Sequence, residues 1–302
     1  MSTAALWLRA LRAPSLTAGA MPALVSAAVA SREGLALSLP HVGLVFFGLV
    51  ALQSGVNLVN DLFDDESGLD RDPEFADMAF PLGSRVLQEG LISRNAMKRA
   101  AVAAFALGGA AGLVLDSVHT GHVVLWLGLL GFALGYSYTA PPLQIAYRGF
   151  GEPITFSLFG PVAGCGAYYV YTGTVSSSSV VASCVLGFWS MTILFLHHFP
   201  QRAADAKHGK QTPVVRLGHR GAGRVVPGLL AAPYFLIGCA IAGGVFPMAA
   251  SVVALTIPIA FQVARTAWQR PEHERAMASS ALLTLALHFF GSLLLIVGFV
   301  FG

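Results

Sequence analysis

Acidic side chains gather in one short stretch of this 302-residue chain. Nine of the fifteen Asp and Glu residues fall between positions 61 and 89: Asp61, Asp64, Asp65, Glu66, Asp70, Asp72, Glu74, Asp77 and Glu89. A solvated acidic loop would explain most charge runs. This one begins inside an apolar run, where Asn57, either Asn60 or Asp61, and Asp64 are three or four residues apart and so share one helical face. Because polar groups at membrane depth are costly unless they are paired or functional, we interpret the stretch as a site.

The oxygen atoms of carboxylates and amides suit hard cations, and Mg²⁺ usually takes one or two carboxylates together with water and substrate phosphates. The candidate magnesium ligands are Asn57, Asp61, Asp64 and Asp70, with Asn60 beside them. Their order is not that of an EF-hand calcium loop. Cations suited to phosphate oxygens follow in the sequence: Arg85, Arg94 and the basic 202–224 loop, which includes Lys210 and Arg216. Acidic metal ligands beside basic phosphate ligands, in a membrane, predict a site for a lipid diphosphate.

The elements that carry these residues are membrane helices. Hydrophobic residues make up 55% of the chain and charged residues 11%, with a mean hydropathy of +0.69, whereas soluble chains carry about 25% charged residues. Apolar stretches near the ~20 residues that cross a bilayer recur at roughly 15–31, 41–60, 96–115, 121–139, 153–173, 178–199, 225–244, 247–267 and 277–300. We therefore expect an all-α membrane protein, one domain over residues 1–302 with nine transmembrane helices in a single bundle. The net charge of +3 is too small and too dispersed to indicate nucleic-acid binding.

Basic residues divide unequally between the two sides of these spans. Every Lys and Arg except Arg32 falls on the side that holds the N-terminus and the two long loops, 61–95 and 200–224. Because cytoplasmic loops carry the excess of Lys and Arg, the N-terminus is predicted in the cytoplasm and the C-terminus outside, in a multi-pass protein of the bacterial inner membrane. The two loops hold most of the concentrated polarity, so we expect the chemistry on the cytoplasmic side.

Three segments have distinctive sequences. Residues 57–70 read NLVNDLFDDESGLD, residues 136–153 read YSYTAPPLQIAYRGFGEP, and residues 209–218 read GKQTPVVRLG. Together with the opening LRALRAP of residues 8–14 and the nine-helix pattern, they resemble the UbiA superfamily of intramembrane prenyltransferases. The resemblance is strongest to its menaquinone and phylloquinone branch, the 1,4-dihydroxy-2-naphthoate prenyltransferases, and it covers nearly the whole chain.

The resemblance implies a nine-helix bundle around a lipid-open cavity that the two cytoplasmic loops cap. It also implies that the first motif binds Mg²⁺ and the diphosphate. The residues that match this motif are Asn57, Asn60, Asp61, Asp64 and Asp70, followed by Arg85. The central segment, where the family lines its cavity and contacts substrate, contains Tyr136, Tyr138 and Arg148. The implied partners are a prenyl diphosphate, a hydrophobic aromatic acceptor and membrane lipid.

The second motif departs from the family pattern. Family members usually carry two or more carboxylates there, whereas residues 201–205 read QRAAD, so that Ala203 and Ala204 leave Asp205 alone. The candidate substitutes are His197, His198 and Gln201, although a histidine pair that caps a helix end explains the two histidines equally well. We expect the catalytic carboxylates to be Asp61, Asp64 and Asp205, with Asp205 also a metal ligand. The substrate contacts expected in this part of the chain are His198, Gln201, Lys210 and Arg216.

The chemistry that this resemblance implies follows from charge. Mg²⁺ and basic side chains stabilise a diphosphate leaving group as its C–O bond breaks. A dry, aromatic-lined cavity protects the allylic cation until an electron-rich aromatic acceptor attacks it, and a carboxylated naphthoate would lose CO₂.

Two other functions fit parts of the pattern. In a membrane terpene cyclase of the same superfamily the substrate's own double bonds attack the cation, and the weakened second motif favours this alternative. An ion-coupled transporter also carries intramembrane carboxylates. Nine helices, however, do not divide into equal inverted repeats, and these carboxylates lie at the cytoplasmic edge of the bundle instead of the midplane.

Overall fold

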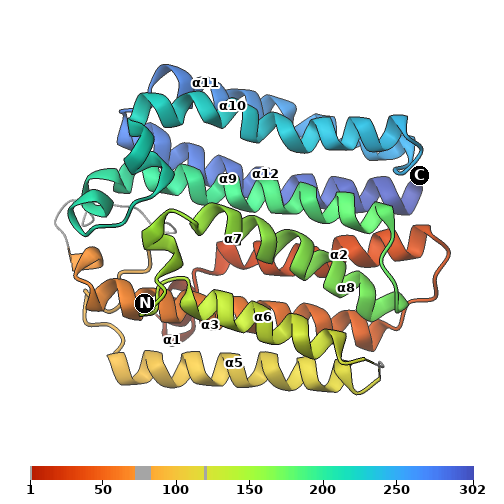
Figure 1. Cartoon of the computed structure of the whole chain (residues 1–302), viewed down its shortest axis with the longest axis horizontal. Helices are drawn as coiled ribbons and strands as arrows, with labels where there is room; N and C mark the ends of the chain where they lie inside the picture. The colour runs from red at the N-terminus through yellow and green to blue at the C-terminus, as the bar shows by residue number, and fades with distance from the viewer. Residues whose placement is uncertain (1, 72–82, 119–120) are drawn as a thin grey trace.

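The computed structural model describes residues 2–71, 83–118 and 121–302. Every regular element in these ranges is a helix, which confirms the all-α prediction. The helices run side by side along the long axis of the molecule (Figure 1). Three carboxylates of the acidic stretch, Asp72, Glu74 and Asp77, lie outside the described residues.

Within the described ranges, seven helices are long and apolar enough to cross a membrane. Two of them join a 3₁₀ segment to an α-helix: η1 (Ala13–Leu16) with α2 (Thr17–Arg32), and η5 (Met248–Thr256) with α11 (Ile257–Gln269). The other five are α3 (Leu39–Glu66), α5 (Arg94–Asp116), α9 (Ser177–Lys207), α10 (Pro213–Ala242) and α12 (Glu274–Phe301). They match seven of the predicted spans, and they indicate an integral, multi-pass membrane protein.

The two other predicted spans have a different form. The 121–139 stretch contains α6 (Val123–Ser137), which has only 15 residues. The 153–173 stretch is divided into α7 (Gly151–Ser157), the π-helical η4 (Leu158–Val162) and α8 (Ala163–Thr172). Pro161 lies in the π-helical turn, where the wider backbone accommodates a residue that lacks an N–H donor. The nine-helix count therefore stays a prediction.

Short helices flank the predicted site. They are α1 (Thr3–Ala10), η2 (Leu69–Arg71) and η3 (Ile145–Arg148). The largest cluster of buried apolar side chains joins α2, α9, α10, α11 and α12, and includes the fully buried Trp189, Met277 and Leu287. A second cluster around Leu58 and Met97 packs α1 onto α3 and α5. The N-terminal helix is thereby fixed beside the acidic end of α3.

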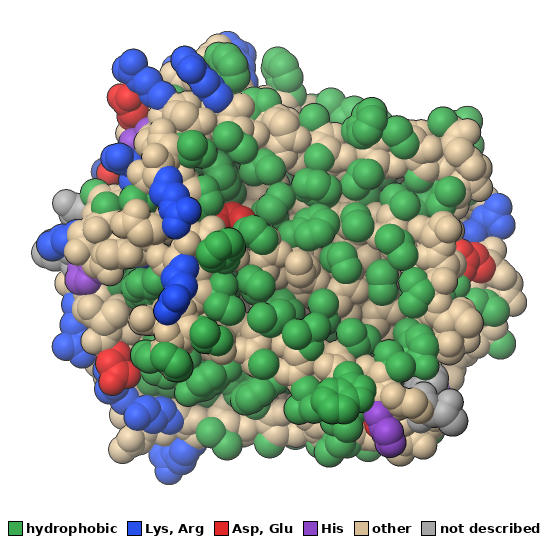
Figure 2. Space-filling model, viewed as in Figure 1, with side chains coloured by type: hydrophobic (Ala, Val, Ile, Leu, Met, Phe, Trp, Pro, Cys, Tyr) green, Lys and Arg blue, Asp and Glu red, His purple; other side chains and the backbone are tan. Residues whose placement is uncertain are grey.

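The two ends of the bundle differ in charge. Hydrophobic side chains cover the middle of the visible face, and most of the Lys and Arg side chains on that face gather at one end (Figure 2). The N-terminus lies towards this end and the C-terminus lies at the other (Figure 1). This asymmetry agrees with the uneven distribution of Lys and Arg along the sequence. The assignment of the basic end to the cytoplasm stays a prediction.

Candidate active site

A cavity of about 620 Å³ lies between α3, α5, α6, α7 to α8, and α9. One part of its wall, which we name the charged end, consists of Arg12, Asn57, Asn60, Asp64, Asp70, His197, His198, Gln201 and Lys210. The structure thus brings together eight residues of the predicted site on the cavity wall: Asn57, Asn60, Asp64, Asp70, Tyr138, His198, Gln201 and Lys210.

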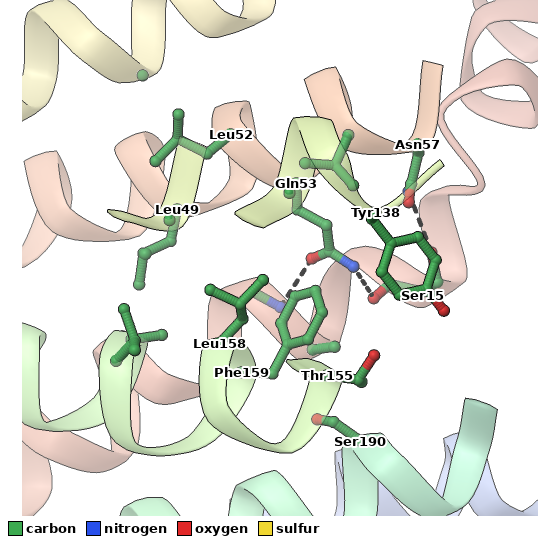
Figure 3. A pocket seen from close by; sticks show the side chains of 18 of the residues that line it. Ser15, Leu49, Leu52, Gln53, Asn57, Tyr138, Thr155, Leu158, Phe159 and Ser190 are labelled. Atoms are coloured by element: carbon green, nitrogen blue, oxygen red, sulfur yellow. Dashed lines mark hydrogen bonds between the residues drawn. The ribbon is translucent and has the colours of Figure 1, made fainter. Parts of the chain in front are cut away.

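The rest of the wall is apolar and rich in glycine. Its glycines on α5 and α6 include Gly109, Gly112, Gly128 and Gly131, and a Cβ added at any of these four would meet no atom within 4 Å. Leu49 and Leu52 of α3 and Phe159 of η4 line the cavity as well (Figure 3). Small residues on facing helices therefore leave room for an elongated apolar ligand.

Asp61, like Asp205, does not line the cavity wall, and two donors hold its carboxylate next to the charged end. Arg12 Nη2 and Ser84 Oγ each donate a hydrogen bond to its carboxylate. The Asp61 side chain is 3% exposed and that of Arg12 13% exposed, so the ion pair is largely shielded from solvent. Burial opposes the charged form of Arg12, but the carboxylates of Asp61 and Asp70 outweigh it and raise the guanidinium pKa. Arg12 was not predicted as a site residue.

Asp64 binds a residue from the central segment. The Tyr147 hydroxyl donates to Asp64 Oδ1 at 3.0 Å and lies 3.0 Å from Ser67 Oγ. Burial, together with the negative charge of Asp64, raises the pKa of the Tyr147 phenol, so this hydroxyl stays protonated as a donor. Lys210 Nζ lies 5.5 Å from the centre of the Tyr147 ring. Residues from α3, η3 and the 208–212 connection therefore meet at one point.

Asp205 is fully buried among other charged groups. Its Oδ2 lies 3.1 Å from His198 Nδ1, and its Oδ1 lies 3.6 Å from Lys210 Nζ. Glu152 approaches the same histidine from α7, with Oε1 3.7 Å from His198 Nε2. Burial opposes the charge on Lys210, yet the carboxylates of Asp205 and Asp64 raise its pKa. Lys210 thus links the two motifs electrostatically, through Asp205 of the second and Asp64 of the first.

A divalent cation fits the donors at this end. Burial raises the pKa of Asp70 to about 8, and repulsion from Asp64 and Asp61 adds to it, so Arg12 and Lys210 compensate the charge of this carboxylate only in part. Asn60 Oδ1 is buried and accepts no hydrogen bond. Among the described residues, no three His, Cys, Asp or Glu side chains form a ready cluster of metal ligands. Mg²⁺ does not require one, since water and substrate phosphates fill most of its positions.

Several predicted site residues lie away from the cavity wall. Tyr136 is 40% exposed, and its ring stacks on Phe132 with centroids 6.0 Å apart. Arg148 and Arg216 are exposed: Arg148 donates to the Pro142 carbonyl, and Arg216 donates to the Arg148 carbonyl at 2.8 Å. Arg85 is half-buried, with a left-handed backbone conformation at φ 55°. None of the four lines the cavity.

Ala203 and Ala204, the second-motif positions without carboxylates, both lie off the cavity wall. Ala204 is 2% exposed and packs against Leu69, whereas Ala203 is exposed. Neither alanine reaches the cavity, because the helical face that does so carries Gln201. Gln201 precedes Asp205 by one helical turn, which is the spacing of a pair of motif carboxylates. Gln201 therefore places a neutral amide on the cavity wall one turn from Asp205.

Gln53 is a polar wall residue that the sequence analysis did not single out. Its Nε2 donates to the Ser15 carbonyl at 2.8 Å, and its Oε1 accepts from the Gly19 amide at 2.7 Å (Figure 3). A Cβ on Gly19 would lie 2.5 Å from this oxygen, so the contact requires glycine. Gln53 lies one turn before Asn57, and extending the polar face of α3 backwards by four residues would have identified it.

Known proteins resemble this chain in sequence and in fold. The sequence profile of the UbiA prenyltransferase family matches residues 19–294. The 2-carboxy-1,4-naphthoquinone phytyltransferase of Synechocystis is 30% identical, over 99% of this chain and 94% of that protein. The 1,4-dihydroxy-2-naphthoate octaprenyltransferase of Bacillus subtilis is 26% identical, over 71% of this chain and 67% of that protein. A UbiA homologue from Archaeoglobus fulgidus bound to DMAPP and Mg²⁺ has a similar fold, with a TM-score of 0.67 at 18% identity over 96% of this chain and 99% of that one. This chain belongs to the UbiA prenyltransferase family, and it is a prenyltransferase.

Proposed function

We propose that the protein transfers a prenyl group from a prenyl diphosphate to an aromatic acceptor of the naphthoate or quinone-precursor type, in a reaction that depends on Mg²⁺. The observation that carries this proposal is the two-part cavity, in which a charged end continues into an apolar, glycine-lined section. A prenyl diphosphate has the same division, with a polyanionic head and a hydrocarbon tail. The UbiA homologue bound to DMAPP and Mg²⁺ supports the same combination of ligands.

The charged end supplies groups for the diphosphate. Asn57, Asp61, Asp64, Asp70 and Asp205 are the residues that would hold Mg²⁺, which when bound neutralises the leaving group. Arg12 and Lys210 place buried cations on the same wall, where a low dielectric strengthens their attraction for phosphate oxygens. We infer that these two cations exchange their present carboxylate partners for diphosphate oxygens when substrate binds.

The apolar section would protect the cation left by departure of the diphosphate. It excludes polar competitors because its wall consists mainly of Leu, Val, Phe and Gly. Phe105, Phe132 and Phe159 line it with aromatic rings, and Tyr138 lies where it meets the charged end. An aromatic face attracts a cation by roughly 0.5–2 kcal/mol.

The acceptor assignment rests on the relatives. The Synechocystis protein is a 2-carboxy-1,4-naphthoquinone phytyltransferase and aligns with almost the entire chain, which supports an acceptor of related chemistry. Attack by an acceptor ring carbon forms the new C–C bond and expels a proton, or CO₂ from a carboxylated position. We also propose that the chain is a single domain, that α6 and the α7–α8 segment cross the membrane to give nine passes, and that the basic end faces the cytoplasm.

Product analysis tests this function. The purified protein is given DMAPP or geranylgeranyl diphosphate, each with and without 1,4-dihydroxy-2-naphthoate, in Mg²⁺ or in EDTA, and products are identified by mass spectrometry. We expect a prenylated naphthol only when Mg²⁺ and the acceptor are both present. A cyclic hydrocarbon formed without acceptor would instead establish the terpene-cyclase alternative.

A further inference from the structure

The hydroxyl group of Ser190 has no partner in the described part of the chain. Ser190 lies on α9, is 3% exposed and belongs to the cavity wall, yet its Oγ makes no hydrogen bond. Serine and threonine in apolar helices usually donate to the carbonyl four residues earlier. Ser183 and Thr192 on the same helix do so at 2.6 and 2.7 Å. The Ser190 hydroxyl is therefore an exception on its own helix.

Close packing of α7 on α9 places Ser190 beside Thr155. A Cβ on Gly187 would lie 2.7 Å from the Phe156 carbonyl oxygen, so the two helices meet one turn before Ser190. Figure 3 shows Thr155 and Ser190 on one side of the cavity, near the rings of Phe159 and Tyr138. Thr155 and Tyr138 both line the cavity. Ser190 is thus a residue of the cavity wall beside Thr155 and Phe159, and its buried hydroxyl has no partner among the described residues.

The cavity wall has two other buried polar atoms without hydrogen-bond partners, Arg12 Nε and Asn60 Oδ1. Both belong to the charged end, where a diphosphate and its cation would satisfy them. Ser190 precedes His197, the first residue of the charged end on α9, by seven residues, which is about 10 Å of helix. A diphosphate bound at the charged end does not extend that far, and a prenyl chain has no oxygen or nitrogen to offer.

A buried hydroxyl without a partner loses roughly 1–3 kcal/mol of hydrogen-bonding free energy. The substrate that can recover it is the aromatic acceptor, which carries oxygen substituents on a flat apolar ring system. We infer that Ser190 hydrogen-bonds an oxygen of this acceptor, and that the section between Ser190, Thr155 and Phe159 is the acceptor subsite. The inference rests on the proposed function and makes Ser190 a determinant of acceptor specificity.

The first test compares Ser190→Ala with Ser183→Ala, which removes a hydroxyl from the same helix away from the cavity. With 1,4-dihydroxy-2-naphthoate and geranylgeranyl diphosphate, we expect Ser190→Ala to raise the KM for the acceptor roughly tenfold, the effect of one lost hydrogen bond. Its KM for the prenyl diphosphate should not change, and Ser183→Ala should change neither. The melting temperature of Ser190→Ala should equal that of the wild type, because the hydroxyl makes no intramolecular bond.

The second test uses the two monohydroxy analogues, 1-hydroxy-2-naphthoate and 4-hydroxy-2-naphthoate, as competitive inhibitors. In the wild type, the analogue that lacks the contacting oxygen should bind about tenfold more weakly than the other. In Ser190→Ala this difference should disappear, since the partner is gone.

The outcomes separate the inference from the proposed function. Wild-type transfer with an unchanged acceptor KM in Ser190→Ala overturns the inference alone, and it would mean that the hydroxyl binds water or nothing. A raised KM for the prenyl diphosphate also overturns it, by assigning Ser190 to the other substrate. Absence of transfer to any aromatic acceptor by the wild type overturns the proposed function and the inference together.

Discussion

Arg12 donates a hydrogen bond to Asp61 across 49 positions of sequence, and so joins the N-terminal segment to the first carboxylate of the acidic stretch. The contact is made possible by the chain between α1 and η1, where Arg12 has a left-handed backbone conformation at φ 52°. The Asn57 amide strengthens the junction by donating to the Leu11 carbonyl at 2.9 Å. The N-terminal segment is therefore part of the candidate site.

Arg12→Ala should impair both folding and substrate binding. It leaves Asp61 buried without its cation, and breaking a buried pair on one side costs about 3 kcal/mol. We expect a lower melting temperature in detergent and a KM for the prenyl diphosphate raised at least tenfold. Arg9→Ala is the control, because Arg9 pairs with the 40% exposed Glu89 at the surface and such pairs contribute about 1 kcal/mol or less. Equal effects of the two variants would contradict a special role for Arg12.

Asp61→Ala and Asp64→Ala should each reduce Mg²⁺-dependent turnover at least a hundredfold, because an oxygen ligand removed from the charged end leaves the diphosphate a poor leaving group. The control lies in the same acidic stretch: Glu66 is 65% exposed and pairs with Arg94, so Glu66→Ala should keep nearly full activity. Turnover is measured by release of diphosphate. Normal turnover in a folded Asp61→Ala or Asp64→Ala protein would remove the metal-site proposal.

Gln201→Asp should lower the Mg²⁺ concentration needed for half-maximal rate, because it adds a carboxylate to the cavity wall one turn from Asp205. Ala203→Asp adds the same charge on the exposed face of α9 and should leave the Mg²⁺ dependence unchanged. Ala204→Asp should destabilise the fold, since it buries a carboxylate against Leu69. A titration of rate against Mg²⁺ checks all three variants. A shift caused by Ala203→Asp and not by Gln201→Asp would contradict the assigned faces of the helix.

Gly112→Phe should change the prenyl chain length that the cavity accepts. Gly112 lines the apolar section on α5, with open space where a side chain would extend. We expect kcat/KM for geranylgeranyl diphosphate to fall at least tenfold while that for DMAPP stays near the wild-type value, because only the longer tail reaches the far end. Gly238→Phe, at an exposed position of α10 that also has open space, should affect neither substrate. Equal losses with both diphosphates would show that the tail does not occupy this section.

Labelling of single cysteines should establish the orientation of the bundle. In a background with Cys165, Cys184 and Cys239 replaced by alanine, we expect Val175→Cys to react with an impermeant reagent from outside. His208→Cys should react only after the cytoplasmic face is exposed. Both positions belong to described connections, before and after α9, whereas the loop positions 72 and 119 lie outside the described residues. External labelling at position 208 would reverse the proposed topology.

Local pattern was sufficient for much of the fold and for one face of the site. A run of ~20 apolar residues is long enough to cross a bilayer as a helix. Seven of the predicted spans are long apolar helices in the structure. Helical periodicity also predicted that Asn57, either Asn60 or Asp61, and Asp64 share a face; Asn57, Asn60 and Asp64 line the cavity, whereas Asp61 does not. These properties depend on residues within a few turns of one another.

Tertiary packing decided which of the candidate residues meet. Tyr147 reaches Asp64 from 83 positions away, and Tyr136, Arg148 and Arg216 lie off the cavity although they belong to recognisable segments. Periodicity fixes the face on which a side chain lies but not the helix opposite it. The same limit applies to Ser190, which looks like an ordinary helix serine until the closely packed glycine contact between α7 and α9 places its hydroxyl on the cavity wall without a partner. The chemistry was therefore readable in residue types, whereas its geometry required the long-range contacts between helices that only the folded bundle forms.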